Sequence, residues 1–356
     1  MVTKIDITSF LELAAIHPIL DVRSPSEYNH AHMPEAYNMP LFADEERKVV
    51  GTAYKQQSRQ EAIKIGLDYF GPKMRKMVEE AEEIIRLHNT NKKQTNNTLL
   101  VHCWRGGMRS AGVAWLLDLY GYKVYTLAGG YKTYRQWVLQ QFLLPYTFRV
   151  VGGYTGSGKT YLLEQLMLRR KTVIDLEGIA HHKGSAFGAL GNSPQPSQEQ
   201  FENNLAAALL AACTGKQDTT IWVEDESRRI GDVNLPEALW NCMRQAPVYF
   251  LDIPFEERVV FLVKEYGKFR KEDLAANIMR IRKRLGGLET KNAIGYLIED
   301  NFSACFGILL RYYDKVYKNG LYNRENVDSL LTTLPGTTVD PVTNCRLLLT
   351  AIDNNN

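Results

Sequence analysis

The segment FRVVGGYTGSGKT, residues 148–160, predicts a strand, a glycine-rich loop and the first turn of a helix. The residues YLLEQLMLRR after it have the apolar spacing of an amphipathic helix. Residues 153–160 match G-x-x-x-x-G-K-[ST], in which backbone N–H groups and a lysine surround phosphate groups. We expect phosphate to be bound by Gly153, Gly156, Ser157, Gly158, Lys159 and Thr160, and the Thr160 hydroxyl can also hold Mg²⁺. Phosphate binding does not by itself imply ATP hydrolysis.

Two carboxylates are candidates for an acidic partner of this loop. Asp175 follows the apolar residues TVI, and Asp225 lies in IWVEDES. Each is near the end of an expected strand, where binding sites of open α/β sheets gather. Either could equally be a solvated turn residue.

Alternating strands and helices predict a parallel sheet on each side of residue 145. We expect strands at 18–24, 97–103, 123–131, 171–178, 219–227 and 246–254, with helices at 54–70, 73–88, 110–122 and 196–215, the last capped by Ser197. Residues 88–98 are expected to form a polar loop, and the chain beyond Phe255 is mostly helical and basic. The expected domains are 1–140, a linker 141–147 broken at Pro145, and a P-loop NTPase-like α/β domain, 148–356, with a helical basic C-terminal part.

Composition indicates an ordinary globular protein, with 45% hydrophobic and 23% charged residues and a net charge of +3. No apolar run is long enough to span a bilayer, and MVTKIDITSF lacks the apolar core of a signal peptide. We therefore expect a cytoplasmic protein with no membrane partner. The five cysteines are scattered and form no CxxC pair, so we expect reduced thiols, no disulfide framework and no zinc site built from cysteines.

A second anion-binding loop is predicted at VHCWRGGMRS, residues 101–110. Cys103 follows an apolar strand and precedes a helix, and glycines at 106 and 107 allow a tight turn. Backbone N–H groups converging on the sulfur would favour thiolate, and Arg105 and Arg109 would add charge. We expect Cys103, Arg105 and Arg109 to be catalytic. Such a thiolate can take up sulfur or selenium, or attack phosphorus.

This loop matches the Cys-x5-Arg pattern of phosphatases, including the preceding His102 and the following Ser110. Upstream, LDVRSPSEYNHAHMPEAYNMP is similar to the rhodanese signature, so residues 5–140 resemble rhodanese sulfurtransferases. Rhodanese loops generally have four residues between cysteine and arginine, whereas this chain has five. The wider loop indicates a larger bound atom or anion, and phosphatases that share the fold stay an alternative.

The helical C-terminal part contains a basic segment at 258–291, where ten Lys and Arg face four Asp and Glu. Tyr266 and Phe269 interleave with these cations, as expected of a nucleic-acid surface with an aromatic platform. A solvated helix face is the alternative. The expected tRNA-binding residues are Lys264, Lys268, Arg270, Lys271, Arg282, Lys283 and Arg284.

Four segments in order, CWRGGMRS, GGYTGSGKT, DLEGIAHHKGSAFG and VEDESRRIG, resemble the tRNA 2-selenouridine synthase family over almost the whole chain. The later two segments supply a candidate second-loop site: Asp175, Glu177, His181, His182, Asp225, Arg228 and Arg229. Taken alone, the adjacent histidines are ordinary loop residues.

The resemblance implies replacement of sulfur by selenium at C2 of a 5-substituted 2-thiouridine, at the wobble position of a tRNA anticodon loop. The selenium donor would be selenophosphate, and the sulfur would first be S-geranylated from geranyl diphosphate. The phosphate loop would hold the diphosphate, and Cys103 would receive or position selenium. No tightly bound cofactor is expected, and a selenophosphate-supplying enzyme is a conceivable partner.

Two other classes of function stay open on these residues. One is a Cys-x5-Arg phosphatase, or a sulfurtransferase, fused to an ATP-dependent kinase-like domain. The other is a carrier that relays sulfur to a partner and senses nucleotide, although a carrier has no need of the long segment after Asp175.

Overall fold

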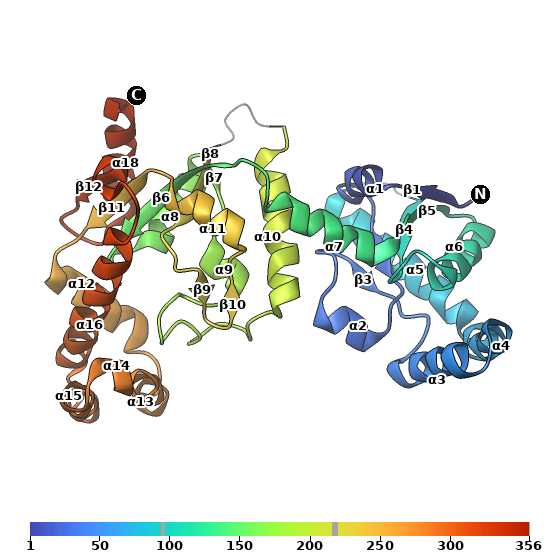
Figure 1. The fold of residues 1–356 in the computed structure, drawn as a ribbon, viewed down its shortest axis with the longest axis horizontal. Helices are drawn as coiled ribbons and strands as arrows, with labels where there is room; N and C mark the ends of the chain where they lie inside the picture. Colours follow the sequence, from blue (N-terminus) through green and yellow to red (C-terminus); the bar gives the residue numbers. More distant parts are fainter. Residues whose placement is uncertain (94–96, 216–219, 356) are drawn as a thin grey trace. The chain divides into compact units, whose positions relative to one another are not determined.

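The computed structural model describes residues 1–93, 97–215 and 220–355, which form two compact units (Figure 1). The first unit comprises Met1–Gln141 together with Glu202–Asn204, and the second comprises Phe142–Phe201 and the chain from Leu205 onward. Each unit is an α/β layered structure around its own parallel sheet. The expected fold class, with a helical C-terminal part, is confirmed.

The sheet of the first unit has five strands in the order β1-β5-β4-β2-β3, all parallel. The strands are β1 (Thr3–Ile5), β2 (Ile19–Asp21), β3 (Tyr37–Asn38), β4 (Thr98–His102) and β5 (Lys123–Leu127). Strand β4 is central, and its residues Leu99, Leu100 and Val101 are apolar and buried, because both faces of the strand are covered by helices. Its carboxyl end therefore opens where sites of parallel sheets gather.

Helices of the first unit are α1 (Ile7–Ala14), α2 (Pro25–His30), α3 (Asp44–Gln56), α4 (Arg59–Phe70), α5 (Met74–Lys92), α6 (Met108–Tyr120) and α7 (Gly130–Gln141), with a 3₁₀ turn at Gly71–Lys73. Buried residues of α5 and α6, including Ala81, Val113 and Leu117, pack with β2, β4 and β5 in one core. Helices α1 and α7 contact each other and β5.

Two local expectations for this unit are wrong. Residues 54–70 form parts of two helices rather than one, because Ser58 adopts an extended backbone and accepts a hydrogen bond from the Glu61 N–H as a new N-cap. The polar segment at 88–98 begins as helix, since α5 continues to Lys92, where His88 is buried and hydrogen-bonds the Ile16 carbonyl. Residues 94–96 of that segment lie outside the described residues.

The sheet of the second unit has the parallel order β12-β11-β6-β8-β7. The strands are β6 (Thr147–Gly153), β7 (Thr172–Val173), β8 (Thr220–Glu224), β11 (Val248–Asp252) and β12 (Leu331–Pro335), and β9 (Arg229–Ile230) pairs with β10 (Val233–Asn234) in a separate ribbon. Edge strand β12 comes from the part of the chain expected to be helical. The strand expected at 171–178 ends at Val173, because Asp175 caps a helix there.

Helices of the second unit are α8 (Lys159–Leu168), α9 (Leu176–Ala180), α10 (Gln198–Cys213), α11 (Glu237–Arg244), α12 (Phe255–Tyr266), α13 (Lys271–Arg280), α14 (Arg282–Leu285), α15 (Gly287–Ile298), α16 (Phe302–Tyr322), α17 (Val327–Leu330) and α18 (Pro341–Asn355). Ser197 caps α10 as predicted, accepting from the Gln200 N–H. Helix α18 packs on α8 beside the sheet.

A second, purely helical core joins α12, α13, α15 and α16. It is built on buried apolar residues such as Leu262, Ile278, Leu297 and Phe306. The second unit therefore contains two cores, one around the sheet that holds the phosphate loop and one within the helical C-terminal part. No helix among the described residues is long and apolar enough to cross a membrane.

Candidate functional site

The cysteine loop begins at Cys103, directly after β4, and enters α6 at Met108. Gly106 has a φ of +60°, which lets the chain reverse tightly. The Cys103 Sγ lies 3.4 Å from the Gly107 N–H that donates to it and 3.2 Å from the Ser110 Oγ. Cys103 is only 3% exposed, so its sulfur faces the donors of its own loop rather than bulk solvent.

These donors set the ionisation of the thiol. Burial raises the pKa of Cys103, but hydrogen bonds from Ser110 and the Gly107 N–H, together with the Arg109 charge, outweigh burial and lower the pKa below its usual value. A buried thiol without such partners behaves in the opposite way: burial raises the pKa of Cys305 to about 11. The loop therefore favours a nucleophilic thiolate at Cys103.

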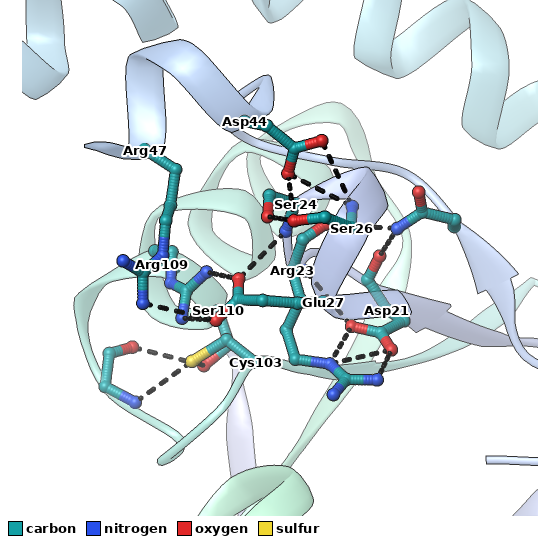
Figure 2. A network of polar contacts seen from close by, with 12 residues as sticks. Asp21, Arg23, Ser24, Ser26, Glu27, Asp44, Arg47, Cys103, Arg109 and Ser110 are labelled. Carbon is teal, nitrogen blue, oxygen red and sulfur yellow. Dashed lines mark hydrogen bonds and ion pairs between the residues drawn. The ribbon is translucent and has the colours of Figure 1, made fainter. Parts of the chain in front are cut away.

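Arg109 is held at the rim of this loop by Glu27, a residue of α2. Its Nη1 donates to the Glu27 Oε2 at 2.6 Å, and its Nη2 donates to the Glu27 Oε1 at 3.4 Å. Arg47 reaches the same carboxylate at 3.4 Å (Figure 2). Burial raises the pKa of Glu27, but its bonds to Arg109 outweigh that effect and lower the pKa. Arg105, expected to be catalytic, has an exposed side chain with no ion pair to another described residue.

The backbone of the loop rests on the start of α7. The Tyr131 N–H donates to the Cys103 carbonyl at 2.9 Å, and the Lys132 N–H donates to the Trp104 carbonyl at 3.0 Å. Gly130 has a φ of +62°, and its Cα lies directly against the loop backbone. This support comes from residues of α7, outside the cysteine motif, so the motif by itself does not predict it.

A buried ion pair lies behind the loop. Arg23 donates through Nε to Asp21 at 3.0 Å and packs its guanidinium 3.7 Å from the centre of the Tyr131 ring. Burial lowers the pKa of the neighbouring His102, which is fully enclosed, so its ring is neutral at pH 7. Asp21 and Arg23, which belong to the upstream signature, therefore support the loop through Tyr131, whose N–H donates to the Cys103 carbonyl.

The phosphate loop connects β6 to α8 as predicted. Gly153, Gly156 and Gly158 have φ values of +147°, +81° and +79°, conformations that other residues rarely adopt. The Lys159 Nζ donates to the Gly153 carbonyl at 3.0 Å, which curls the lysine over the loop. Ser157 is 1% exposed, and its Oγ has no hydrogen-bond partner among the described residues.

Arg258 holds this loop from below. Its Nη1 donates to the Thr155 carbonyl at 3.2 Å, and the guanidinium forms a two-bond ion pair with Asp314 at 2.7 and 2.8 Å. Because Arg258 is 3% exposed, it does not belong to the basic surface on which we counted it. That surface is correspondingly less basic.

The carboxylates that interact with Thr160 and Lys159 of the phosphate loop are Glu177 and Glu226, not Asp175 or Asp225. The Thr160 Oγ1 donates to Glu177 at 3.3 Å. Glu177 and Glu226 hydrogen-bond each other, which requires a proton between the two carboxyl groups. Burial, and then the Glu177 charge, raise the pKa of Glu226 well above its usual value, while the Lys159 charge acts in the opposite direction.

The two aspartates we expected have other partners. Asp175 accepts from the Gly178 N–H at 2.7 Å and so caps α9. Asp225 accepts from the Tyr317 hydroxyl at 2.6 Å and pairs with the buried Arg324. Tyr317 in turn accepts from the Gly153 N–H at 3.1 Å. Asp225 therefore positions the first glycine of the phosphate loop through Tyr317.

The remaining second-loop residues divide between the cavity and the surface. His181 ends α9 and contacts the Pro194 carbonyl at 3.0 Å, and Arg228 pairs with Glu237 at 3.2 Å on the surface. His182 and Arg229 line the cavity beside the phosphate loop. Burial lowers the pKa of His182 below its usual value.

A cavity of about 1670 Å³ opens from the phosphate loop within the second unit. Lys159, Thr160, Glu177 and Glu226 line one part of it. Apolar and aromatic side chains from α12 and α16 line another part: Phe261, Leu262, Tyr266, Tyr312, Tyr313 and Val316. The cavity thus offers a phosphate-binding end and an apolar wall.

The basic segment is partly neutralised. Arg270 pairs with Asp273 at 2.9 Å and Lys271 pairs with Asp300 at 2.7 Å. The other expected cations are exposed, with no ion pair to another described residue: Lys264, Lys268, Arg282, Lys283 and Arg284.

The aromatic residues expected to form a platform beside these cations are partly buried against the helical core. Tyr266 packs against Phe187 and Phe306, with ring centres 5.9 and 6.2 Å away. Phe269 in turn lies 6.2 Å from the Tyr266 ring. Both rings therefore contribute to the helical core, and Tyr266 also lines the cavity.

Two family models match this chain, one in each half. A model of the tRNA 2-selenouridine synthase AAA domain matches residues 146–331, and a model of the rhodanese-like domain matches residues 7–136. A tRNA 2-selenouridine synthase of Shewanella piezotolerans is 37% identical over 296 residues, covering 77% of this chain and 77% of the relative. This chain belongs to the tRNA 2-selenouridine synthase family.

Solved structures match less than half of the chain. The N-terminal domain of a Clostridium difficile protein described as an ATP/GTP-binding protein is 39% identical, covering 38% of this chain and 99% of that chain, with a TM-score of 0.35. Saccharomyces cerevisiae Ygr203w, described as a homolog of single-domain rhodanese and the Cdc25 phosphatase catalytic domain, is 15% identical. It covers 39% of this chain and 83% of that chain, with a TM-score of 0.24.

Proposed function

We propose that this protein replaces sulfur by selenium at C2 of a 5-substituted 2-thiouridine at the wobble position of tRNA. Selenophosphate would supply the selenium, and geranyl diphosphate would first alkylate the sulfur. The observation that supports this most directly is that a thiolate loop and a phosphate loop opening on an apolar-walled cavity occur in one chain of this family. An exchange in two stages needs both sites.

The phosphate loop would act in the first stage. Its N–H groups and Lys159 would hold the diphosphate, and the aromatic wall around Phe261 and Tyr312 would take the prenyl chain. The thiouridine sulfur would attack C1 of the geranyl group while the C–O bond breaks toward diphosphate. Thr160 and Glu177 supply oxygen donors of the kind that Mg²⁺ prefers and would hold this ion, which would neutralise charge on the diphosphate.

The cysteine loop would act in the second stage. A thiocarbonyl sulfur leaves poorly, whereas an S-geranylated sulfur departs as geranylthiol when selenium adds at C2.

The basic residues Arg282, Lys283 and Arg284 would bind tRNA phosphates, whose contacts are electrostatic. An enzyme that makes selenophosphate would be the natural supplier, because the anion is consumed stoichiometrically.

Nucleoside mass spectrometry of 2-thiouridine-bearing tRNA tests this function. The protein with geranyl diphosphate alone should yield the S-geranyl nucleoside, and adding selenophosphate should yield the 2-seleno nucleoside. Cys103→Ser should stop at the first product, and Lys159→Ala should form neither. An unchanged nucleoside mass, or brisk ATP hydrolysis with no dependence on geranyl diphosphate, would overturn the proposal in favour of a kinase-like enzyme.

A further inference from the structure

The cysteine loop has a feature that selenium uptake alone leaves unexplained. Five residues separate Cys103 from Arg109, one more than rhodanese loops generally have. The Gly107 N–H, the Ser110 hydroxyl and the nearby Arg109 guanidinium surround the sulfur with donors suited to several oxygen atoms at once. A single selenium atom needs one such donor, whereas a tetrahedral phosphoryl group uses them all.

We propose that Cys103 attacks the phosphorus of selenophosphate and releases hydrogen selenide, instead of carrying selenium itself. This inference rests on the proposed function and assigns the phosphorus, not the selenium, as the atom that Cys103 contacts. The loop then acts as a phosphatase loop does, and the hydrogen selenide that leaves phosphorus is the reagent that modifies tRNA. The phosphatase pattern and the selenium chemistry thus belong to one reaction.

The step balances without any further reactant. The Cys103 thiolate attacks selenophosphate that carries one proton on selenium and forms an S–P bond. The P–Se bond breaks, and its electron pair leaves with selenium, which keeps that proton and departs as the hydrogen selenide anion. Hydrogen selenide adds at C2 of the S-geranylated uridine and expels geranylthiolate, which takes up a proton. Water then hydrolyses the phosphocysteine to phosphate and regenerates the thiolate.

Direct selenium transfer to the sulfur does not balance in this way. A thiolate that attacked selenium would leave the P–Se electron pair on phosphorus and release phosphite. Reaching phosphate instead would require a two-electron oxidant, which neither the donor nor the proposed reaction supplies. Attack on phosphorus keeps phosphorus and selenium in their original oxidation states.

The surroundings of Cys103 fit this chemistry. Arg109 is aligned by its two hydrogen bonds to Glu27, which hold its guanidinium at the loop rim. The Glu27 carboxylate is therefore engaged and is not free to protonate a leaving group. The hydrogen selenide anion needs no further proton, because its conjugate acid is a stronger acid than a thiol. Ser110 lies 3.2 Å from the sulfur, where its hydroxyl can stabilise the thiolate that departs when phosphocysteine is hydrolysed.

The first test uses selenophosphate with radiolabelled phosphorus, full-length protein and a rapid denaturing quench. Label should appear on the peptide that contains Cys103.

Ser110→Ala should raise the fraction of protein trapped as phosphocysteine about tenfold, the size expected for losing one hydrogen bond to a charged sulfur. Ser26→Ala is the matched control, since Ser26 bonds Asp44 at 2.5 Å and does not contact Cys103. Phosphoryl and selenium adducts have nearly equal mass, so the isotope pattern of selenium distinguishes them.

The second test bypasses the donor with hydrogen selenide on tRNA that is already S-geranylated. Cys103→Ala should then form the 2-seleno nucleoside as fast as the wild-type protein does under the same conditions. With selenophosphate the same variant should remain inactive. A variant that stays inactive with hydrogen selenide while the wild-type protein reacts would overturn the inference.

The two tests separate this inference from the proposed function. Selenium isotopes on Cys103, with no phosphorus label in either serine variant, would refute phosphorus attack while selenated tRNA still supported the function. Phosphorus label on Cys103 with no selenium in tRNA would support P–Se cleavage and refute the tRNA reaction.

Discussion

Replacing Gly130 by alanine should disable the cysteine loop, although Gly130 lies 27 positions after Cys103. A Cβ at this position would collide with the Cys103 carbonyl and the Gly106 nitrogen, and would lie 2.9 Å from the Arg105 nitrogen. All three are backbone atoms of the loop, and none can rotate away as a side chain would. The collision therefore moves the loop itself.

The expected cost has two parts. A φ of +62° costs a non-glycine residue about 1–2 kcal/mol, and overpacking against backbone adds about 1–3 kcal/mol. The sum, about 2–5 kcal/mol, is relieved most easily by displacing the loop from α7. A displacement of about 1 Å at a reacting group typically costs about a hundredfold in rate. We expect selenation by Gly130→Ala to fall by about that factor.

Gly121→Ala is the matched control for this substitution. Gly121 ends α6 with a φ of +114°, and a Cβ there would meet nothing within 4 Å. It carries the conformational cost without the collision, so it should lower the melting temperature slightly and leave selenation nearly unchanged. The assay is selenation of S-geranylated tRNA with a thermal melt of each variant. Equal activities for the two folded variants would refute the reasoning.

Three further predictions concern the phosphate loop, Glu27 beside the cysteine loop, and the basic segment. Lys159→Ala should abolish S-geranylation, measured on tRNA nucleosides, whereas Lys171→Ala on the nearby surface should not; activity in the first variant would contradict the role of the phosphate loop. Burial raises the pKa of Glu27, but its polar contacts, those with Arg109 foremost, lower it below its usual value. When the pH falls through this lowered pKa, Glu27 is protonated and releases Arg109, so selenation from selenophosphate should decline. Glu27→Gln should lose this acid limb, and an unaltered pH profile would count against Glu27 as the group that positions Arg109. Arg282→Glu should weaken tRNA binding and reduce the slope of log affinity against log salt by about one or more, whereas Arg86→Glu, on the first unit, should not; equal slopes would remove 282–284 from the tRNA surface.

The sequence by itself determined the two anion-binding loops and the kind of sheet that holds them. Both loops are written in consecutive residues, because a strand, a glycine turn and a helix start are local structures whose donors are mostly backbone N–H groups. The Ser197 cap was readable for the same reason. The four ordered segments were specific enough to indicate the family.

Only the tertiary structure decided which side chains serve those loops. Glu27 lies 82 positions from Arg109, and Gly130 supports Cys103 from another helix, so neither has a signal within the motif. Glu226 stands beside Asp225 in the chain, yet it is Glu226 that meets Glu177 near Lys159, while Asp225 turns to Arg324. Arg258 looked like a surface residue because charge does not report burial. Packing of α12 against α16 encloses it, since long-range contacts, rather than local pattern, set which face of a helix meets the core.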